Sequence, residues 1–391
     1  MKVLYVSPYP PAQDGIGDYT RLLVAAGRQQ GHDVRVVVPR LTPHAHPDVI
    51  GAVGSRGRES AELREAIAKW DPDVVHVQFA IAAYGTQTVA LLRWLDALRR
   101  DLAVPVVGTL HEVTRETALL RAAGRKFYRE IVARCEHVIV HTHVAHNALT
   151  GPVGVAESKV VVIPHPRARP PDGTSTPEDV RRRFGLGEAR ILLAFGFIHV
   201  DKGLDDLVGA LSILRRTSAA PLDDVRVVVA GTVRPRHGLF RVFEVRDRLH
   251  LARILRQARR KSLQQYLVLT GYVPADEISA WFHAAEAVVL PYRRTEQSGV
   301  ASLASAFGVP VIASAVGGLR EQFAGSRWTF PARAPEFLAR VLIEFLSATP
   351  SEQARLVRPP HATDLASVIT ATFQLYGRVT TDHARAVAAL P

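Results

Sequence analysis

The sequence predicts an α/β protein with two parallel-sheet domains, and three observations support this fold class. Short β-branched segments alternate with helical segments of ten or more residues, which is the pattern of βαβ units. The alternation stops at residues 167–183, a stretch rich in proline, charge and small polar residues, and then restarts. The chain has 391 residues, more than one hydrophobic core usually supports. We therefore expect two Rossmann-like domains that face each other across a cleft.

The expected elements follow this alternation in order. The first half contains expected strands at residues 3–7, 33–38, 74–78, 105–109, 137–141 and 159–163, and helices at about 19–30, 60–69, 86–100 and 121–134. The second half contains expected strands at 191–195, 225–230, 267–270, 287–290 and 310–314, with a helix at about 203–215. Residues 365–376 also have helical apolar spacing. We expect a first domain at 1–168, a linker at 169–184, a second domain at 185–362, and a C-terminal helix at 363–391 that returns toward the first domain.

Composition excludes several classes of protein. With 47% apolar and 22% charged residues, the chain is globular and not disordered throughout. The single cysteine, Cys135, rules out an intramolecular disulfide framework and a Cys-rich zinc site. The first apolar run is too short for a signal peptide because Pro8 interrupts it, and serine, glycine and proline break the uncharged run 300–319. We expect a cytoplasmic protein, with any membrane contact peripheral at the inner face.

The net charge of +12 is unevenly distributed. Residues 234–261 contain ten basic residues and two acidic ones, with apolar residues interleaved. A basic amphipathic helix can lie on an anionic membrane, which predicts a peripheral membrane contact here. The alternative is an ordinary helix that packs its apolar side on a sheet, and a GC-rich genome alone can enrich arginine. Aromatic stacking motifs of RNA-binding modules are absent, so no nucleic-acid partner is expected.

Three glycine-containing loops follow expected strands and carry candidate ligand-binding groups. In the loop 8–20, Gly15 and Gly17 allow close backbone approach to a phosphate at a helix N-terminus. This loop is not the dinucleotide fingerprint, because Thr20 stands where a third glycine is needed. The alternative is a glycine-rich turn without a ligand.

The other two loops lie in the second half. Residues 196–207 place His199 and Lys202 beyond a strand end, where an anion would bind in an open α/β sheet. Glu296 stands at the end of another expected strand, and the helix after it begins with residues whose amides could hold a phosphate, Gln297, Ser298 and Gly299. The alternatives are a surface lysine and a carboxylate that only caps a helix.

Several segments, in this order and spacing, together resemble the retaining nucleotide-sugar glycosyltransferases of family four (glycosyltransferases group 1). The segments are the glycine loop 8–20, GTLHEV (108–113), VIVHT (138–142), KVVVIPHP (159–166), FGFIHVDKGLDDLVGAL (195–211), VVVAGT (227–232), LTGYVPADEISAWFHAAEAVVLPY (269–292), the EQSG segment beginning at residue 296, and VGGLRE (316–321). The resemblance covers nearly the whole chain. It implies the GT-B architecture, with the nucleotide sugar held mainly by the second domain.

The resemblance also implies roles for individual residues. Lys202 would hold the diphosphate, and Glu296 would accept hydrogen bonds from sugar hydroxyls. His111 would contact the donor sugar from the first domain, and His199 would replace an arginine that is common at its position. We therefore expect a catalytic set of His111, Lys202 and Glu296. The expected donor-binding set is Gly15, Gly17, His199, Lys202, Gln297, Ser298 and Gly299.

The predicted reaction moves a sugar from a nucleotide-diphosphate sugar to a hydroxyl on a glycan, a lipid-linked sugar or a natural product. The resemblance implies retention of anomeric configuration, and we expect neither a cofactor nor a metal ion. One family feature is missing: the second glutamate, eight residues after the first, corresponds to Ala304, or to Leu303 in the alternative alignment. How the ribose is held is therefore open.

Other interpretations remain beside this one. Four histidines, His137, His141, His143 and His146, have spacing that a metal site could use, although a strand end is the simpler explanation. The acidic pair Asp71 and Asp73 precedes an expected strand, so it is interpreted as a turn. A pyridoxal-type phosphorylase needs a Schiff-base lysine, and none of the six lysines has a suitable context. The alternative function is a catalytically silent nucleotide-sugar- or nucleic-acid-binding protein of the same fold.

Overall fold

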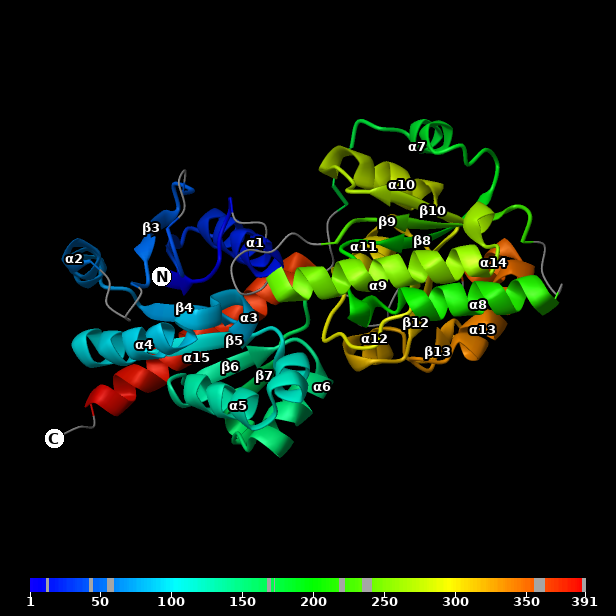
Figure 1. Ribbon diagram of the computed structural model, residues 1–391. Coiled ribbons are helices and arrows are strands. Elements are labelled where there is room, and N and C mark those ends of the chain that lie inside the picture. Colours follow the sequence, from blue (N-terminus) through cyan, green and yellow to red (C-terminus); the bar gives the residue numbers. More distant parts are fainter. Residues whose placement is uncertain are drawn as a thin grey trace. The chain divides into compact units, whose positions relative to one another are not determined.

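The chain divides into two compact units, which are described separately. Unit 1 comprises Met1–Pro166 together with Thr363–Pro391, and unit 2 comprises Arg167–Ala362. The structure is a computed structural model that describes residues 1–11, 14–41, 45–54, 60–166, 170–171, 173–217, 222–233, 241–354 and 363–388, without the side chains of 386 and 387. The long helix at the carboxyl end of the chain therefore belongs to the same unit as the first strand (Figure 1).

Unit 1 is built on a seven-stranded parallel sheet in the order β3-β2-β1-β4-β5-β6-β7. The strands are β1 (Lys2–Val6), β2 (Asp33–Val38), β3 (Val49–Ala52), β4 (Val74–Phe79), β5 (Val106–Leu110), β6 (His137–Val140) and β7 (Val160–Val162). The helices are α1 (Gly15–Gln29), α2 (Ala61–Trp70), α3 (Ile81–Tyr84), α4 (Thr88–Leu102), α5 (Val113–Ala133), α6 (His143–Ala148) and α15 (Leu365–Ala388). Short turns of helix lie at η1 (Gly85–Gln87), η2 (Leu149–Val153) and η3 (Glu157–Lys159).

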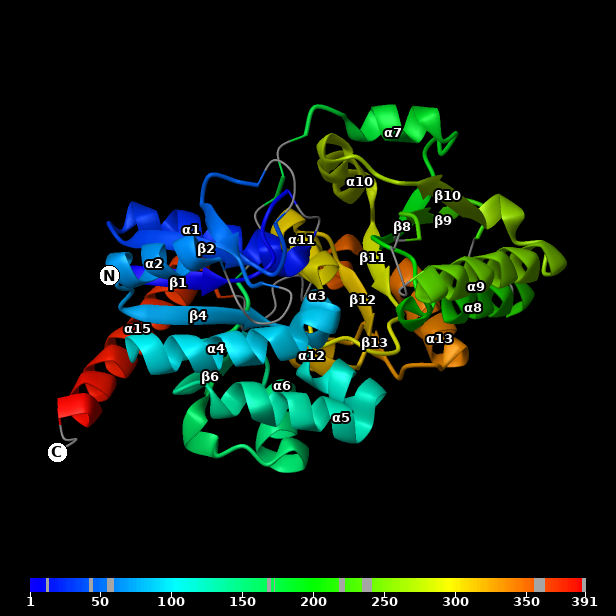
Figure 2. The same ribbon diagram turned by 60° about the vertical axis from the view of Figure 1, so that its left-hand side comes forward.

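Both faces of this sheet are covered, as its alternating buried side chains require. Leu4 and Val6 of β1 face a core formed with α2, α4, α5 and α6, whereas Val3 and Tyr5 face a core formed with α1 and α15. The helix α15 contacts α1 and places Tyr376 fully inside this second core. Figure 2 shows α15 behind the sheet, on the side opposite α4.

Unit 2 repeats the architecture with a six-stranded parallel sheet in the order β10-β9-β8-β11-β12-β13. The strands are β8 (Arg190–Phe195), β9 (Val225–Ala230), β10 (Leu267–Gly271), β11 (Ala287–Leu290), β12 (Val311–Ser314) and β13 (Thr329–Phe330). The helices are α7 (Pro177–Arg183), α8 (Leu204–Thr217), α9 (Arg241–Arg260), α10 (Ile278–Ala284), α11 (Gly299–Phe307), α12 (Gly317–Gln322), α13 (Pro335–Ser347) and α14 (Pro350–Gln353). Short turns of helix lie at η4 (Val200–Lys202), η6 (Gln264–Tyr266) and η7 (Ala275–Glu277).

The helices of unit 2 also lie on both faces of their sheet. The side chains of α8, α9 and α13 form one core, and those of α7, α10, α11 and α12 form the other. Figure 1 shows α8 and α9 side by side along the first of these faces, and the two helices are in contact. The α/β class with two Rossmann-like sheets, predicted from the alternation of segments, is confirmed.

Several elements differ from the sequence expectation, each for an identifiable reason. The helix α1 begins at Gly15 and not near Tyr19, because the Asp14 side chain caps it by accepting a hydrogen bond from Ile16 N at 2.9 Å. The edge strand β3 was missed because it is short and only half-buried. Helix α5 begins at Val113 and is interrupted at Arg121, where φ is +49°. The expected linker contains α7, which starts with a capping box at Thr176.

Candidate active site

In the sheet of unit 2, successive strands are added first on one side of β8 and then on the other. From β8 the chain adds β9 and β10 on one side, and then crosses to add β11 and β12 on the other. In open parallel sheets, ligands bind beyond the carboxyl ends of the strands at such a switch point. The loops that follow β8 and β11 therefore meet where binding groups are expected, and these loops carry Lys202 and Glu296.

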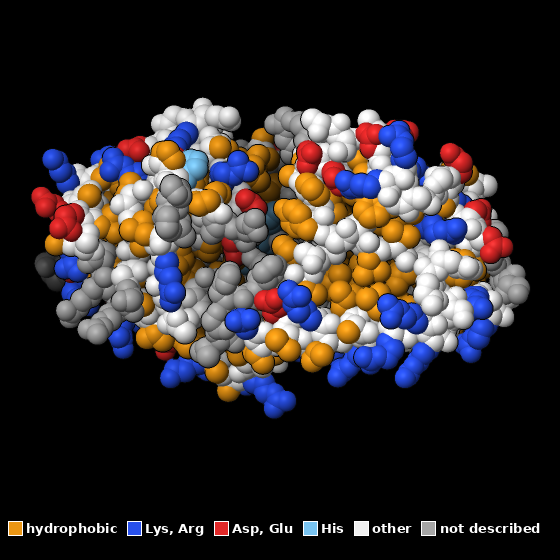
Figure 3. Space-filling view, turned by 45° about the horizontal axis from the view of Figure 1, so that its top comes forward, with side chains coloured by type: hydrophobic (Ala, Val, Ile, Leu, Met, Phe, Trp, Pro, Cys, Tyr) orange, Lys and Arg blue, Asp and Glu red, His pale blue; other side chains and the backbone are white. Residues whose placement is uncertain are grey.

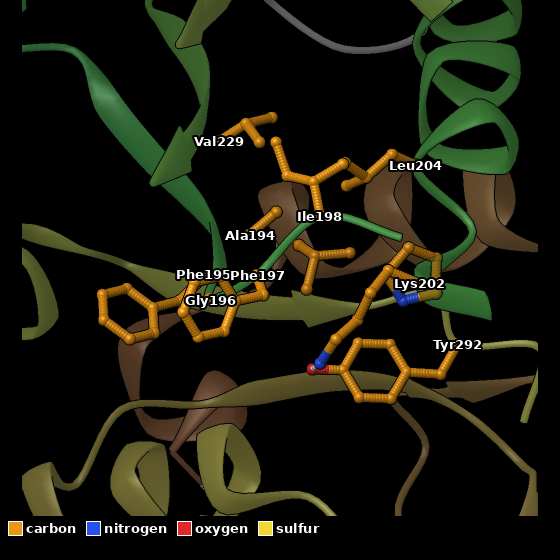
Figure 4. A pocket seen from close by; sticks show the side chains of 11 residues that line it. Ala194, Phe195, Gly196, Phe197, Ile198, Lys202, Leu204, Val229 and Tyr292 are labelled. Carbon is orange, nitrogen blue, oxygen red and sulfur yellow. Dashed lines mark hydrogen bonds between the residues drawn. The ribbon is translucent and has the colours of Figure 1, made fainter. Parts of the chain in front are cut away.

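Lys202 is held against an aromatic ring at this point. Its Nζ donates a hydrogen bond to the Tyr292 hydroxyl and lies 3.7 Å from the centroid of the same ring. Both residues line a pocket beyond β8 and β11 with Gly196, Phe197 and Pro291, and Figure 4 shows the lysine reaching across to the tyrosine. An ammonium group has three N–H bonds, so two stay available for an anion. The tyrosine thus fixes the position of the cation.

Gly203 explains how closely the two loops approach. Its φ is +63°, and a Cβ at this residue would lie only 1.8 Å from the Pro291 carbonyl oxygen. Only glycine can occupy this position without displacing the backbone. The sequence DKG therefore brings Lys202 directly against the loop after β11.

An ion-pair cluster also holds the same two loops together. Arg293 donates from Nη2 to Asp205 at 2.6 Å and to Asp206 at 2.9 Å, and its backbone N–H donates to the Asp201 carbonyl at 2.8 Å. Asp205 and Asp206 lie in the first turn of α8, and Asp206 is buried. The arginine is thereby occupied within the protein, which leaves Lys202 as the cation that faces the pocket among its lining residues.

Glu296 is buried, with 4% of its surface exposed, at the end of the loop after β11. The N–H of Gly318 donates to its backbone carbonyl at 3.2 Å. The neighbouring Gly317 has φ +46°, and a Cβ there would lie 1.7 Å from the Thr295 carbonyl oxygen. The VGG sequence at the start of α12 is therefore packed directly onto the glutamate segment.

Helix α11 begins immediately after this glutamate. Ser298 is its N-cap, and the Ser298 Oγ accepts a hydrogen bond from Ala301 N at 3.1 Å. Gly299 is exposed, and a Cβ there would have no heavy atom within 4 Å, so the helix N-terminus is open on that side. The first N–H groups of a helix lack intrahelical partners and favour an anion. Gln297 precedes the cap, and its carbonyl accepts a hydrogen bond from the Thr295 hydroxyl.

His199 lies at the start of η4, and its carbonyl accepts a hydrogen bond from Lys202 N at 2.9 Å. The structure thus brings His199, Lys202 and the loop after β11 together at one end of unit 2. At the position expected for a second glutamate, Ala304 is fully buried in the core and Leu303 packs against it.

The remaining predicted residues lie in unit 1, at the carboxyl ends of its strands. Gly15 is exposed at the first turn of α1, whereas Gly17 is buried and a Cβ there would lie 3.1 Å from the Pro8 carbonyl oxygen. The Asp14 carboxylate occupies the N-terminus of this helix as its cap. Gly17 therefore serves at least the close packing of α1 on the loop after β1.

His111 follows β5 and belongs to a cluster of aromatic and imidazole rings. Its Nε2 is 2.7 Å from Gln78 Oε1, and its ring centroid is 5.1 Å from that of His141 and 5.6 Å from that of Tyr19. Burial, followed by the neighbouring histidines, lowers the pKa of His111 well below its ordinary value. His111 is therefore neutral at physiological pH.

Burial likewise lowers the pKa of His76 and of His141 to about 3 and also lowers that of His165. Within the described ranges, no three His, Cys, Asp or Glu side chains are grouped so that they could hold a metal ion. Of the histidines in the 137–146 segment, His141 points into the ring cluster and His143 is exposed at the start of α6. The sequence pattern singled out His141 but not His76, which lies in β4, or His165, which follows β7.

Sequence reasoning also missed Tyr292, Gln78 and the Arg293 cluster. Tyr292 lies two residues after β11 and ends the quoted segment 269–292, but neither feature indicated its contact with Lys202. The pairing with Lys202 depends on two loops that are ninety residues apart in sequence. No local pattern reports such a contact.

Two family descriptions match the chain, one in each unit. Residues 13–167 match the description "Glycosyltransferase Family 4", and residues 189–348 match "Glycosyl transferases group 1".

Relatives with assigned names match over nearly the whole chain. A glycogen synthase of Mycobacterium tuberculosis (strain ATCC 25618 / H37Rv) is 26% identical, covering 96% of this chain and 94% of the relative. A D-inositol 3-phosphate glycosyltransferase of Kineococcus radiotolerans is also 26% identical, covering 98% and 96%.

Solved structures share the fold at lower identity. Sucrose-phosphate synthase from Thermosynechococcus elongatus has a TM-score of 0.75 at 18% identity, covering 98% of this chain and all of that one. Anabaena Alr3699/HepE in complex with UDP has a TM-score of 0.69 at 16% identity, with both chains fully covered. Consecutive family matches in both units, together with this fold, lead to one assignment: the chain belongs to the family-four (group 1) glycosyltransferases of the GT-B fold.

Proposed function

We propose that this glycosyltransferase moves a sugar from a nucleotide-diphosphate sugar to a hydroxyl acceptor with retention of anomeric configuration. The observation that carries the proposal is the position of Lys202, fixed on Tyr292 at the switch point of unit 2. The open N-terminus of α11 follows Glu296 on the adjoining loop. The complexes of Anabaena Alr3699/HepE with UDP and with UDP-glucose, which share this fold, support a nucleotide sugar as donor.

The proposed reaction needs no covalent intermediate with the enzyme. The bond between the sugar anomeric carbon and the diphosphate oxygen breaks, and the leaving nucleoside diphosphate keeps the electron pair. The acceptor oxygen forms its bond to the same carbon on the same face, and the acceptor proton passes to a diphosphate oxygen. The products are a nucleoside diphosphate and a glycoside with the donor's anomeric configuration.

The protein's task in this reaction is to stabilise charge that develops on the diphosphate. Lys202 has two N–H bonds to offer beside the one that Tyr292 receives. The first amides of α11, beginning at Gly299, add partial positive charge. Preorganised donors of this kind need no reorientation as the transition state forms, which is why they lower the barrier.

Two further side chains are proposed to contact the sugar. Buried Glu296 would accept hydrogen bonds from sugar hydroxyls, a role that requires a fixed acceptor and not an acid catalyst. Neutral His111 would contact another hydroxyl. With cationic and amide groups assigned to the diphosphate, the proposed reaction requires no metal ion.

Binding measurements test the donor site directly. UDP, GDP and ADP and their sugars are screened by thermal shift and the best binder is measured by calorimetry. A ligand at one hundred times its Kd should add about 2.7 kcal/mol to the stability of the unit that binds it. Lys202→Ala should weaken binding of the nucleoside diphosphate, whereas Lys261→Ala, at another lysine of unit 2, should not. Binding without any turnover of the sugar would favour a catalytically silent protein, and no binding would refute the proposal.

We also propose that the acceptor side of the reaction involves an anionic membrane, contacted through α9. This helix has seven arginines and only two acidic residues, Glu244 and Asp247. Asp247 is buried and pairs with Arg246 at 3.2 Å, and Glu244 pairs with Arg248 at 2.8 Å, which leaves a net charge of +5 on the helix. The part of segment 234–261 that precedes Arg241 lies outside the described residues.

The outer face of α9 is apolar as well as basic. Val242, Val245 and Leu249 recur at helical spacing and are 64%, 55% and 55% exposed. Figure 3 shows Lys and Arg side chains, in blue, along the lower right edge of that view, where few acidic ones are visible. Within the described part of the chain, no helix is long and apolar enough to cross a membrane. Apolar insertion with flanking arginines is how a peripheral helix binds anionic lipid.

Vesicle flotation separates this proposal from an ordinary solvated helix. Vesicles that contain an anionic lipid should bind the protein at low salt and release it at high salt, and vesicles of neutral lipid should not bind it. Replacing Val242, Val245 and Leu249 together by serine should abolish flotation. Tyr272→Ser, at a 63% exposed aromatic residue of the same unit, is the matched control. Undiminished flotation of the triple variant, or none by the wild type, would refute the membrane contact.

A further inference from the structure

A chain of buried hydrogen bonds connects His111 to the C-terminal helix inside unit 1. It runs from His111 Nε2 to Gln78 Oε1 (2.7 Å), from Gln78 Nε2 to His76 Nε2 (3.2 Å), from His76 Nδ1 to the Tyr376 hydroxyl, and from there to the Tyr5 hydroxyl (3.0 Å). Tyr5, His76, Gln78 and Tyr376 have no exposed surface. The members come from β1, β4, the end of β5 and α15, so the fold has assembled them from four places in the sequence.

The orientation of the Gln78 amide determines which group donates and which accepts in each of these hydrogen bonds. An amide oxygen only accepts and an amide nitrogen only donates. Because Oε1 faces His111, the His111 Nε2 must carry a proton and donate it. Because Nε2 of Gln78 faces His76, the His76 Nε2 must accept, and Thr109 Oγ1, at 2.8 Å, can donate to the same atom.

The remaining bonds follow from this direction. With its Nε2 accepting, neutral His76 carries its proton on Nδ1 and donates to Tyr376, which donates to Tyr5. The opposite orientation of the Gln78 amide would exchange donor and acceptor in every hydrogen bond from His111 to Tyr5. The two arrangements therefore differ at His111 in a single observable property, which is the nitrogen that carries the proton.

The charge state of the cluster supports a neutral relay. The groups that face His111 are Gln78 from β4, His141 after β6, Tyr19 from α1 and, at longer range, His76 and His165. Burial lowers the pKa of His76 to about 3 and raises that of Tyr376, so both are uncharged at neutral pH. A neutral imidazole with its proton on Nε2 presents a bare lone pair at Nδ1.

We propose that Gln78 is a positioning residue that holds His111 with its proton on Nε2, so that His111 Nδ1 accepts a hydrogen bond from a hydroxyl of the sugar substrate. No described residue donates to this Nδ1. The part that concerns the sugar rests on the proposed function, whereas the part that concerns the proton position does not. The relay through His76 to Tyr376 and Tyr5 fixes Gln78 in turn, because both ends of its amide are hydrogen-bonded within the core.

The test of the proton position needs no substrate. Long-range ¹H–¹⁵N spectra of the imidazole groups are recorded for the wild-type chain and for His111→Ala, and the signals that disappear belong to His111. We expect His111 to carry its proton on Nε2 at pH 7. Gln78→Leu removes the acceptor, so the variant should show a mixture of both tautomers. A proton on Nδ1 in the wild type, or an unchanged spectrum in Gln78→Leu, would overturn the proposal.

Kinetics then test the connection to the sugar. Gln78→Leu should lower kcat by about 10- to 100-fold, the range seen when the hydrogen-bond partner that orients a metal-bound histidine is removed. Its KM for the donor should change less, and the affinity for the nucleoside diphosphate should not change, because the relay lies in unit 1. Gln87→Leu, at another buried glutamine of unit 1, controls for the loss of a buried amide.

Gln78→Glu supplies a readout that a structural role would not give. A carboxylate can still accept from His111 Nε2, so near neutral pH and above this variant should retain more activity than Gln78→Leu. The negative charge favours the imidazolium, so it raises the pKa of His111, and activity should fall as the pH drops through that raised value. The wild type should not lose activity in the same range through this group. Identical pH profiles for the two proteins would contradict the positioning role, even if sugar transfer itself were established.

Discussion

The buried histidines of unit 1 predict an acid sensitivity that can be assigned to one residue, His141. Its ring is 5% exposed, its Nδ1 donates to the Ile163 carbonyl at 2.8 Å, and burial lowers its pKa to about 3. The folded chain therefore keeps this imidazole neutral, whereas the unfolded chain protonates it near pH 6.5. Since the unfolded state binds more protons below that pH, the free energy of unfolding must decrease as the pH falls from about 6.5 toward 3.

The size of the effect follows from these two pKa values. Between pH 7 and pH 5, a histidine with a pKa of 6.5 when unfolded and about 3 when folded removes about 2 kcal/mol of stability. His141→Asn retains a side-chain N–H that can reach the Ile163 carbonyl but cannot titrate. The variant should be less stable than the wild type at pH 7 through lost packing. Its further loss between pH 7 and pH 5 should be smaller than that of the wild type by about 2 kcal/mol.

The assay must distinguish the two units. Urea unfolding is followed at both pH values by pulsed hydrogen exchange and mass spectrometry, with peptides from β6 reporting unit 1 and peptides from β8 reporting unit 2. Comparing the pH-dependent loss of stability in wild type and variant cancels the contribution of other titrating groups of unit 1. Glu112 and Glu116, whose pKa values burial raises, are two such groups. Equal pH-dependent losses in wild type and variant would refute the conclusion that His141 is neutral in the folded chain.

Four further predictions concern the donor site and the need for a metal ion. Lys202→Ala should lower kcat by about 100-fold or more while the thermal midpoint stays near that of the wild type, and near-normal turnover would remove the lysine from the mechanism. Tyr292→Phe should keep the ring under the ammonium group but lose its hydroxyl anchor, so a loss of transfer rate smaller than that of Lys202→Ala is expected, and a larger one would contradict the assigned order of importance. Gly203→Ala should cost unit 2 about 3 kcal/mol or more in urea unfolding, since its Cβ would overlap the Pro291 carbonyl, and a stability like that of the wild type would show that the loops approach less closely. Transfer should persist in the presence of a strong chelator, and complete loss of activity that added metal restores would refute a metal-independent reaction.

The fold could be predicted from the sequence because parallel strands buried on both faces are nearly continuous runs of apolar residues. The strands β1, β4, β8 and β9 all have this character, and all lie close to the expected positions. The boundaries of helices were harder to predict, because they depend on capping interactions. The single bond from Ile16 N to Asp14 moves the start of α1 four residues ahead of the expected position.

The candidate site could be predicted only where a functional residue lies in a local motif. Lys202 and Glu296 stand just beyond strand ends in recognisable loops, so the pattern located them. Tyr292 anchors Lys202 across ninety residues, and Gln78 of β4 bonds to His111, which follows the neighbouring strand β5, as well as to His76 of its own strand. Such contacts depend on the order of strands in the sheet, which periodicity and spacing do not specify.

The surface charge is a second case in which the structure adds what composition lacks. Helical spacing alone does not say which arginines of α9 are paired with its two acidic residues. Asp247 is 1% exposed and pairs with Arg246, and Glu244 pairs with Arg248, whereas Arg253 and Arg256 are exposed in the second half of the helix. The positive charge in excess of these pairs therefore lies mostly in the second half of α9.

The most direct test of the central claim is to measure nucleoside diphosphate release together with the anomeric configuration of the product. The purified chain is incubated with each nucleotide sugar that it binds, in the presence of candidate hydroxyl acceptors, and the product is analysed by NMR. We predict one molecule of nucleoside diphosphate released per glycoside formed, retention of configuration, and loss of both signals in Lys202→Ala. A product of inverted configuration, or transfer that Lys202→Ala leaves intact, would contradict the proposed reaction and the role of its donor site.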